Sequence, residues 1–172
     1  MLNREEIKEQ IKTWFVEETK MQHWKIVHNE NDLNYYYYCT ITKIINQVIE
    51  EKIEKIESGL CTICIDKDVE RVILFTNIKF SKSDSTNYKL SLEKEKFWND
   101  VRLRLMPLRV GIYAIPDIDN IEQLQLRKII YFDGWSRDRV MNDFFTMIDA
   151  AELVELLFRK FSNYMSDKVR RD

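Results

Sequence analysis

Two cysteines separated by two residues, Cys61 and Cys64, have the spacing of a metal-binding or redox pair. A zinc site needs about four ligands, and no second cysteine or histidine pair stands at a suitable spacing in the chain. A redox pair would begin a helix, which lowers the thiol pKa, whereas this pair lies within a predicted strand. Residues three apart on a strand face opposite sides, so we expect one buried thiol, one half-buried thiol and no metal ion.

The histidines and two aspartate pairs give weaker signals. His23 and His28 stand an odd number of residues apart on one predicted strand, so they would face opposite sides and share neither a metal nor a proton. Asp66 and Asp117 each begin an Asp-x-Asp pair, which can hold Mg²⁺ when phosphates or waters complete its coordination shell. Turns also collect aspartate for backbone hydrogen bonds. A metal-dependent hydrolase using these Asp pairs is therefore only our third hypothesis. In the preferred interpretation the aspartates serve the turns, and we expect no cofactor.

The segment Asp133–Ser136 joins a strand-like run to a long helix, and its side chains could form a binding site. Asp-Gly supplies the tight turn, and the serine can cap the helix. Trp135 beside Tyr131 and Phe132 would form an exposed aromatic lip at the helix N-terminus, where anionic groups are favoured. In the alternative, the tryptophan packs under the first turn of the helix. We take Tyr131, Trp135 and Arg137 as candidate binding residues.

A run of four tyrosines, Tyr35–Tyr38, places two rings on each face of a predicted strand. One pair would join the core. We expect the other pair, Tyr36 and Tyr38, to stay exposed as an interface, because tyrosine offers a large contact area at low entropy cost. Base stacking on such a strand is conceivable, but no RNA-binding motif accompanies it.

The second half of the chain is rich in basic residues, with acidic residues interspersed among them. The whole chain has 27 Lys and Arg against 29 Asp and Glu, a net charge of −2. The simpler interpretation is therefore a solvated surface of mixed charge, and the alternative hypothesis is a nucleic-acid-associated protein. The basic residues concerned are Arg102, Arg104, Arg109, Arg127, Lys128, Arg137 and Arg139, with Lys168, Arg170 and Arg171 at the tail.

The 172 residues suit a single domain over 1–172, with 45% hydrophobic and 33% charged residues. Only three Gly and two Pro occur, which favours long regular elements. No run approaches the length of a membrane-spanning helix, and the chain opens on polar residues without a signal-peptide core. Three cysteines fit reduced thiols. We expect a cytoplasmic protein without a membrane partner.

These residues must be positioned by regular elements, which the hydrophobic pattern predicts. Asn3 and Glu6 form a candidate capping box for an amphipathic N-terminal helix. Trp24–His28 and Tyr35–Thr42 are typical of a β-hairpin, because they alternate or are rich in aromatic and β-branched residues. Ile44–Glu57 fits a helical wheel better than strict alternation. We predict a helix there and keep a strand as the alternative, since its β-branched residues weaken the helix.

The remaining pattern predicts a second hairpin, a middle helix, two more strands and a long final helix. The hairpin strands are Leu60–Ile65 and Arg71–Phe80, followed by a polar loop over Ser81–Asn87. Ser91 can cap a helix whose apolar face is Phe97, Val101 and Leu105 and which ends near Met106. Strands over Arg109–Ile115 and Leu124–Phe132 and a helix of about 30 residues from Ser136 complete the order.

The final helix carries one continuous apolar seam over four heptads. At roughly 45 Å it exceeds what a small sheet needs to cover, so the seam is either core or a homodimer interface. Its residues are Val140, Phe144, Met147, Ala151, Val154, Phe158, Phe161 and Met165.

This order predicts an α+β fold of two layers, an antiparallel sheet built from hairpins with an N-terminal, a middle and a long C-terminal helix. It resembles the secretion-chaperone-like fold of type III secretion chaperones. Three patches resemble a family of uncharacterised archaeal proteins with that fold: Ile11-Lys-Thr-Trp14, the corner from Ile129 to Ser136, and the following helix with Phe144, Phe145 and Ile148. The resemblance implies a dimer that binds extended polypeptide.

No catalytic constellation stands out in the sequence. Our first hypothesis is therefore a non-enzymatic, homodimeric protein-binding or chaperone-like module with a polypeptide partner.

Overall fold

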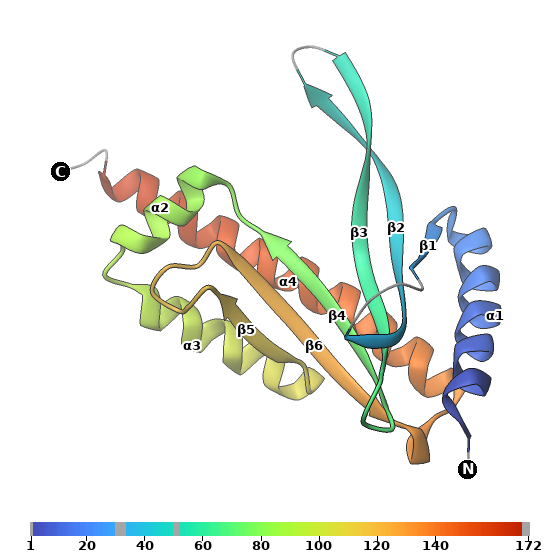
Figure 1. Ribbon diagram of the computed structural model, residues 1–172. Coiled ribbons are helices and arrows are strands. Elements are labelled where there is room, and N and C mark those ends of the chain that lie inside the picture. Colours follow the sequence, from blue (N-terminus) through green and yellow to red (C-terminus); the bar gives the residue numbers. More distant parts are fainter. Residues whose placement is uncertain (1, 30–33, 50–51, 170–172) are drawn as a thin grey trace. The chain divides into compact units, whose positions relative to one another are not determined.

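The computed structural model describes residues 2–29, 34–49 and 52–169 (Figure 1), without the side chains of residues 29, 45–49, 52–57 and 163–169. The ten main elements, in chain order, are α1 (Arg4–Gln22), β1 (Lys25–Asn29), β2 (Tyr35–Ile49), β3 (Lys52–Asp66), β4 (Arg71–Lys79), α2 (Lys82–Leu90), α3 (Lys94–Leu105), β5 (Gly111–Ile115), β6 (Gln123–Tyr131) and α4 (Arg137–Val169). Short 3-10 turns follow α3 and β6.

The strands form one six-stranded sheet in the order β1-β2-β3-β4-β6-β5. The β1–β2, β2–β3, β3–β4 and β5–β6 pairs are antiparallel. The α+β class, the antiparallel sheet and the N-terminal and long C-terminal helices are thus confirmed. Within residues 2–29, 34–49 and 52–169, no helix has both the length and the apolar character needed to span a membrane.

The chain divides into two compact units. The first comprises Met1–Phe75 and Ile129–Phe144, and the second comprises Thr76–Lys128 and Phe145–Asp172. Strands β4 and β6 and helix α4 contribute residues to both units.

In the first unit, α1 begins at the predicted capping box. The Asn3 side chain accepts from the Glu6 backbone N–H at 2.9 Å, and the Glu6 carboxylate accepts from Asn3 N–H at 2.8 Å. These bonds satisfy two of the N–H groups that a helix start leaves without partners. On the apolar face of α1, Ile7, Ile11 and Phe15 are fully buried, and Phe15 packs edge-on against Phe144 of α4 with ring centroids 5.0 Å apart.

The predicted helix over Ile44–Glu57 is wrong. Residues 44–49 continue β2 and residues 52–57 begin β3, paired in antiparallel register with Ile45 opposite Ile56 and Val48 opposite Ile53. β1 pairs with β2 only as far as Thr42, and the β3–β4 register begins at Thr62. Strand pairing thus outweighs the helical spacing, in line with the β-branched composition. We call residues 43–49 and 52–58 the β-arm; Figure 1 shows it as a twisted two-stranded ribbon.

The expectation of one half-buried thiol is also wrong, because Cys61 and Cys64 are both buried, and neither forms a disulfide. Strand β3 lies between β2 and β4, and it is buried on both faces from Leu60 to Ile65 except for the half-buried Thr62. An inner strand covered on both sides hides every side chain regardless of alternation.

The second unit contains α2, where a polar loop was predicted over Ser81–Asn87. Ser81 caps the helix by accepting from Asp84 N–H at 3.1 Å. Its one buried side chain is Tyr88, which is fully covered. The helix therefore depends on its cap and on tertiary packing rather than on an amphipathic pattern, which explains why the sequence pattern missed it. The middle helix is α3, which begins at Lys94, later than the predicted cap Ser91.

Helix α4 begins after Ser136, whose hydroxyl accepts from Arg139 N–H at 3.3 Å as predicted. Within the chain itself, the seam residues from Val140 to Phe158 are buried, and Phe161 is half-buried. The side chain of Met165 lies outside the described part. A homodimer through the seam stays a prediction, and the seam is already packed inside the chain.

Candidate protein-interaction site

Two of the predicted binding residues, Trp135 and Arg137, lie against helix α1. The Trp135 ring stacks on Trp14 with centroids 5.5 Å apart and an interplanar angle of 22°, and its indole N–H donates to Gln10 at 2.7 Å. Arg137 forms an ion pair with Glu17 at 2.9 Å. The corner thus packs on α1, a contact that the sequence did not predict, since it offered only an exposed lip or packing under the first turn of α4 for Trp135.

The predicted tyrosines are more dispersed. Tyr36 is exposed on β2, and its hydroxyl donates to the Glu5 carboxylate. That bond raises the pKa of Tyr36 and lowers the pKa of Glu5, because it favours the protonated phenol and the ionised carboxylate. Tyr38 is half-buried, and Tyr131 is 51% exposed at the end of β6. The five residues do not form one cluster in the contacts described for them, and their binding role stays a prediction.

The basic residues of the second half are largely engaged by groups near them. Arg102 lies over the Trp98 ring at 5.1 Å, Arg139 reaches the Gly134 carbonyl at 3.2 Å, and Lys128 donates to the Leu108 carbonyl at 3.1 Å. A basic side chain in such a contact keeps its charge, but it is less available to bind a phosphate. The basic tail lies outside the described side chains.

The aspartates and cysteines considered as possible metal ligands form hydrogen bonds within turns or lie in the core. Asp117 accepts from the backbone N–H groups of Asn120 and Asp119, which lowers its pKa. Burial alone would raise the pKa of Asp66, but the N–H groups of the turn and Arg71 outweigh it and the pKa falls. Burial raises the pKa of the Cys39 thiol to about 12. In the described part of the chain, no three His, Cys, Asp or Glu side chains gather where a metal ion could sit.

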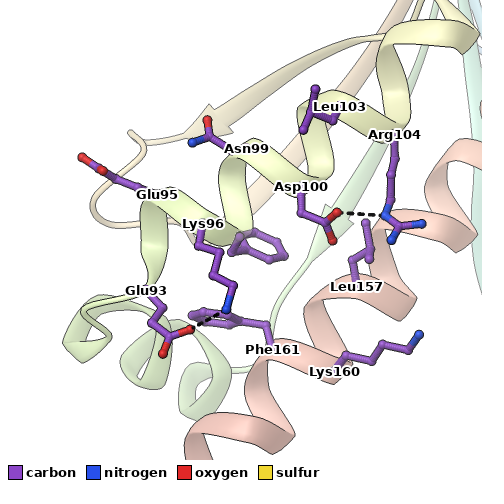
Figure 2. Close-up of a pocket in the computed structure, with 11 residues that line it drawn as sticks. Glu93, Glu95, Lys96, Asn99, Asp100, Leu103, Arg104, Leu157, Lys160 and Phe161 are labelled. Carbon is purple, nitrogen blue, oxygen red and sulfur yellow. Dashed lines mark hydrogen bonds and ion pairs between the residues drawn. The ribbon is translucent and has the colours of Figure 1, made fainter.

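The second unit has a groove between α3 and α4 that the sequence did not predict (Figure 2). Its open volume is about 920 Å³. We call it the helical groove. It is lined by Glu93, Glu95, Lys96, Phe97, Asn99, Asp100, Leu103 and Arg104 on the α3 side and by Leu157, Lys160 and Phe161 of α4.

Apolar side chains form the floor of the helical groove. Phe97 and Phe161 face each other across the two helices with centroids 5.1 Å apart, and Leu157 lies one turn along α4. Leu103 extends the apolar lining at the outer side of α3 and is 65% exposed. Figure 2 shows Glu95, Asn99 and Leu103 on the side of α3 that points away from α4.

Charged side chains at the rim neutralise one another locally. Lys96 pairs with Glu93 at 3.6 Å, and Arg104 pairs with Asp100 at 3.0 Å (Figure 2). With Glu95 and Lys160 added, three acidic and three basic residues line the groove. An apolar floor with a balanced polar rim is the anatomy of a protein interface rather than of an anion or cation site.

An aromatic cluster beneath the groove holds its floor in place. Phe158 packs against Phe80 at 3.6 Å and against Phe97 at 5.4 Å between ring centroids. Tyr88 packs beside them, and its hydroxyl donates to the Ile118 carbonyl at 2.8 Å. Burial, aided by the charge of Asp119, raises the pKa of Tyr88 to about 12, so the phenol stays protonated and keeps that bond.

One sequence signal could have indicated the helical groove. Phe97, Val101 and Leu105 were expected to form the buried face of the middle helix, and all three are buried. Leu103 lies off that face, and an exposed leucine on an otherwise charged side of a helix is a weak sign of contact with something else. The α4 half of the groove gave no such sign, because its residues belong to the seam.

A family model described as an uncharacterized conserved protein, DUF2299, matches residues 7–158. Among solved structures, an uncharacterized protein from Methanothermobacter thermautotrophicus is similar, with a TM-score of 0.65 and 17% identity. The match covers 89% of this chain and 96% of that one, and at this identity it concerns the fold alone. The comparison with curated proteins gave no match.

Proposed function

We propose that this chain, which belongs to the DUF2299 family of uncharacterized conserved proteins, is a non-enzymatic, cytoplasmic protein-binding module. The observation that carries the proposal is the helical groove, with Phe97, Leu157 and Phe161 at its floor and paired charges at its rim. Its partner is an amphipathic helix whose apolar face lies on this floor.

The dimensions support a helix as the ligand. Helix α3 has 12 residues, about 18 Å of axis, which matches roughly three turns of a bound helix. Such a ligand would present apolar residues at positions i, i+3, i+4 and i+7 to the floor and polar residues to the rim. Because four of the six rim charges form ion pairs with each other, the apolar contacts would supply most of the affinity, and specificity would come from rim hydrogen bonds.

The proposal can be tested with a fluorescein-labelled amphipathic Leu/Lys helix of about 14 residues, titrated with protein and followed by anisotropy. Phe161→Glu places a carboxylate in the floor, and we expect it to weaken binding by about tenfold or more. Leu156→Glu adds the same charge to an exposed position of α4 outside the groove and should bind like wild type.

A second pair of variants separates loss of the groove from loss of the fold. Lys160→Trp narrows the groove without removing a packed side chain, and Arg159→Trp adds the same bulk at a neighbouring exposed position. Weaker binding by the first but not the second supports the groove, provided that the circular dichroism spectra match. Equal binding by all variants, or no binding by wild type, would exclude it.

Homodimerisation and a chaperone-like role are part of the same proposal. The β-arm supports them, because its strands include Ile44, Ile45, Val48, Ile49, Ile53 and Ile56, and a two-stranded hairpin alone is marginally stable in water. The similar solved structure comes from an archaeon, which supports the further proposal that the family is archaeal.

Light scattering coupled to size exclusion tests the dimer. We expect twice the chain mass for wild type and the single-chain mass for a Ile44→Lys, Val48→Lys variant of the β-arm. Val27→Lys, at a half-exposed position of β1, is the control that should stay dimeric. A monomeric wild type would remove the dimer from the proposal and leave the groove untouched.

A further inference from the structure

One face of the strands in the second unit is open to solvent. Burial alternates along β6, where Leu124 and Leu126 are fully buried and Gln125 and Arg127 are not. The register places Tyr113 of β5 opposite Gln125, and Ile115 opposite Gln123. In an antiparallel pair, residues opposite each other share a face, so these side chains lie together on the open side.

The open face carries a connected polar network around one aromatic ring. Gln123 and Gln125 both donate their amide N–H groups to the Asn77 side-chain oxygen, at 3.1 and 2.9 Å. Arg127 donates to the Gln125 side chain, and its guanidinium lies 4.7 Å from the centre of the Tyr113 ring. Tyr113 is 48% exposed. The network holds the ring and the guanidinium in a defined arrangement before any ligand binds.

A second groove, the basic groove, adjoins this face. It has an open volume of about 640 Å³, and it shares Lys79, Ile115 and Gln123 with the open face. Helix α2 contributes Lys82 and Lys89, which are seven residues apart and therefore lie on one side of the helix.

The charged residues of the basic groove are mainly positive. Lys79, Lys82 and Lys89 are exposed in its lining, against a single carboxylate, Glu122. Asp117 lies near enough to Lys89 for that lysine to help lower its pKa, and it accepts four hydrogen bonds within its turn. With Arg127 on the open face and both carboxylates counted, the surface has an excess of two positive charges.

We propose that the basic groove and the open face together bind a single-stranded nucleic acid. The lysines contact successive phosphates, and bases lie on Tyr113 and on the Arg127 guanidinium, with the Gln and Asn amides at their edges. Lysine contacts to phosphate supply salt-dependent affinity, and aromatic or guanidinium planes accept any base. An acidic peptide would use the lysines but not the ring, which is why the combination favours nucleic acid.

The strand is single because its bases must be free to stack on an exposed ring. Stacking on Tyr113 requires an unpaired base, whereas a duplex keeps its bases inside. Moving from Ile115 to Gly111 spans four residues of β5, about 13 Å, so the surface would hold only a few nucleotides. RNA differs from DNA by its 2′-hydroxyl group, so the test compares an RNA strand with a DNA strand of the same length.

The test uses the full chain and labelled U20, dT20 and a 20-base-pair duplex, followed by anisotropy from ~50 mM to ~200 mM salt. We expect U20 or dT20 to bind and the duplex to bind more weakly. The triple variant Lys79→Gln, Lys82→Gln, Lys89→Gln should reduce the slope of log K against log salt by about 2, at about 0.7 for each phosphate contact.

Two controls decide whether the surface is specific. The matched variant Lys96→Gln, Arg104→Gln, Lys160→Gln removes three positive charges from the helical groove of the same unit and should leave the slope unchanged. Tyr113→Ala should weaken single-strand binding by about tenfold without changing the slope, while Tyr113→Phe should retain it.

Several results would overturn the proposal. These are no binding at ~50 mM salt, equal loss in both triple variants, tighter binding of the duplex, or displacement of U20 and dT20 by poly-glutamate as readily as by unlabelled strand. Displacement by poly-glutamate would assign the surface to an acidic protein. Because the helical groove lies on other residues, either proposal can fail while the other stands.

Discussion

The helical groove and the basic groove belong to the same compact unit but differ in how their charges are arranged. In the helical groove, acidic and basic rim residues are equal in number, and two ion pairs, at 3.0 and 3.6 Å, join them over an apolar floor. In the basic groove, three lysines stand against one carboxylate. Where the charges are paired, as in the helical groove, affinity must come mainly from apolar contact. Where positive charges are in excess, as in the basic groove, an anionic partner is favoured.

The two grooves also depend on one support. Phe158 contacts Phe80, which lines the basic groove, and Phe97, which lines the helical groove. The aromatic cluster is thus common to both surfaces, and their difference arises from the side chains placed on top of it. Four experiments can break or sharpen this comparison.

The largest effect is expected from Phe158→Ala. Removing a ring that is 3% exposed and packed against four aromatic neighbours should lower the free energy of unfolding by about 3–5 kcal/mol and weaken ligand binding at both grooves. Urea denaturation measures the first effect. Leu156→Ala, at an exposed position of the same helix, should change stability by less than about 0.5 kcal/mol. If the variant lost ligand binding at only one groove, the aromatic cluster would not support both.

Salt should separate the two grooves. Between ~50 and ~200 mM salt, three phosphate contacts predict about a 20-fold loss of single-strand affinity. Binding of the amphipathic helix should change by less than about twofold, because exposed ion pairs contribute little to it. Parallel anisotropy titrations on one protein preparation measure both, and similar salt slopes for the two ligands would contradict the comparison.

Acid should destabilise the protein through Asp84 of α2, the helix that lines one side of the basic groove. Hydrogen bonds from the hydroxyls of Ser81 and Ser162, each at 2.7 Å, lower the pKa of Asp84 from its ordinary value of 3.8. Its contribution is therefore complete above the ordinary pKa and is lost as pH falls through the lowered one. Asp84→Asn should cost about 0.5–1 kcal/mol near pH 7, a difference that narrows below pH ~4. Thermal melts across pH measure it, and a difference independent of pH would contradict the assignment.

The smallest effect is expected from Arg104→Ala in the helical groove. Its pair with Asp100 is about half-exposed on both sides, so the free energy of unfolding should change by less than about 0.5 kcal/mol. Affinity for the amphipathic helix should stay within about twofold. A loss of tenfold would mean that the rim, rather than the floor, carries the binding energy.

Elements with a strong local signal were predicted correctly. The capping box of α1, the Ser136 cap of α4, the hairpins and the α+β class follow from patterns within a few residues, and the expected uncharacterised family was confirmed. The β-arm was assigned to a helix because periodicity alone could not weigh strand pairing across the hairpin. Helix α2 was missed because tertiary packing of Tyr88 stabilises it.

The candidate sites were largely beyond the sequence. Trp135 and Arg137 were identified as candidate binding residues, but their contacts with α1 could not be predicted. The lysines of the basic groove were hidden because Lys82 and Lys89 share a face only if their segment is helical.

The class of fold, the caps of α1 and α4 and the apolar seam follow from the sequence alone, because those depend on the spacing of residue types along one element. Only the tertiary structure decided which surfaces remain exposed. Both thiols of Cys61 and Cys64 are covered, while Leu103, Tyr113 and the three lysines of the basic groove are left at the surface. The physical reason is that burial depends on the neighbours that packing brings together, and those neighbours come from distant parts of the chain.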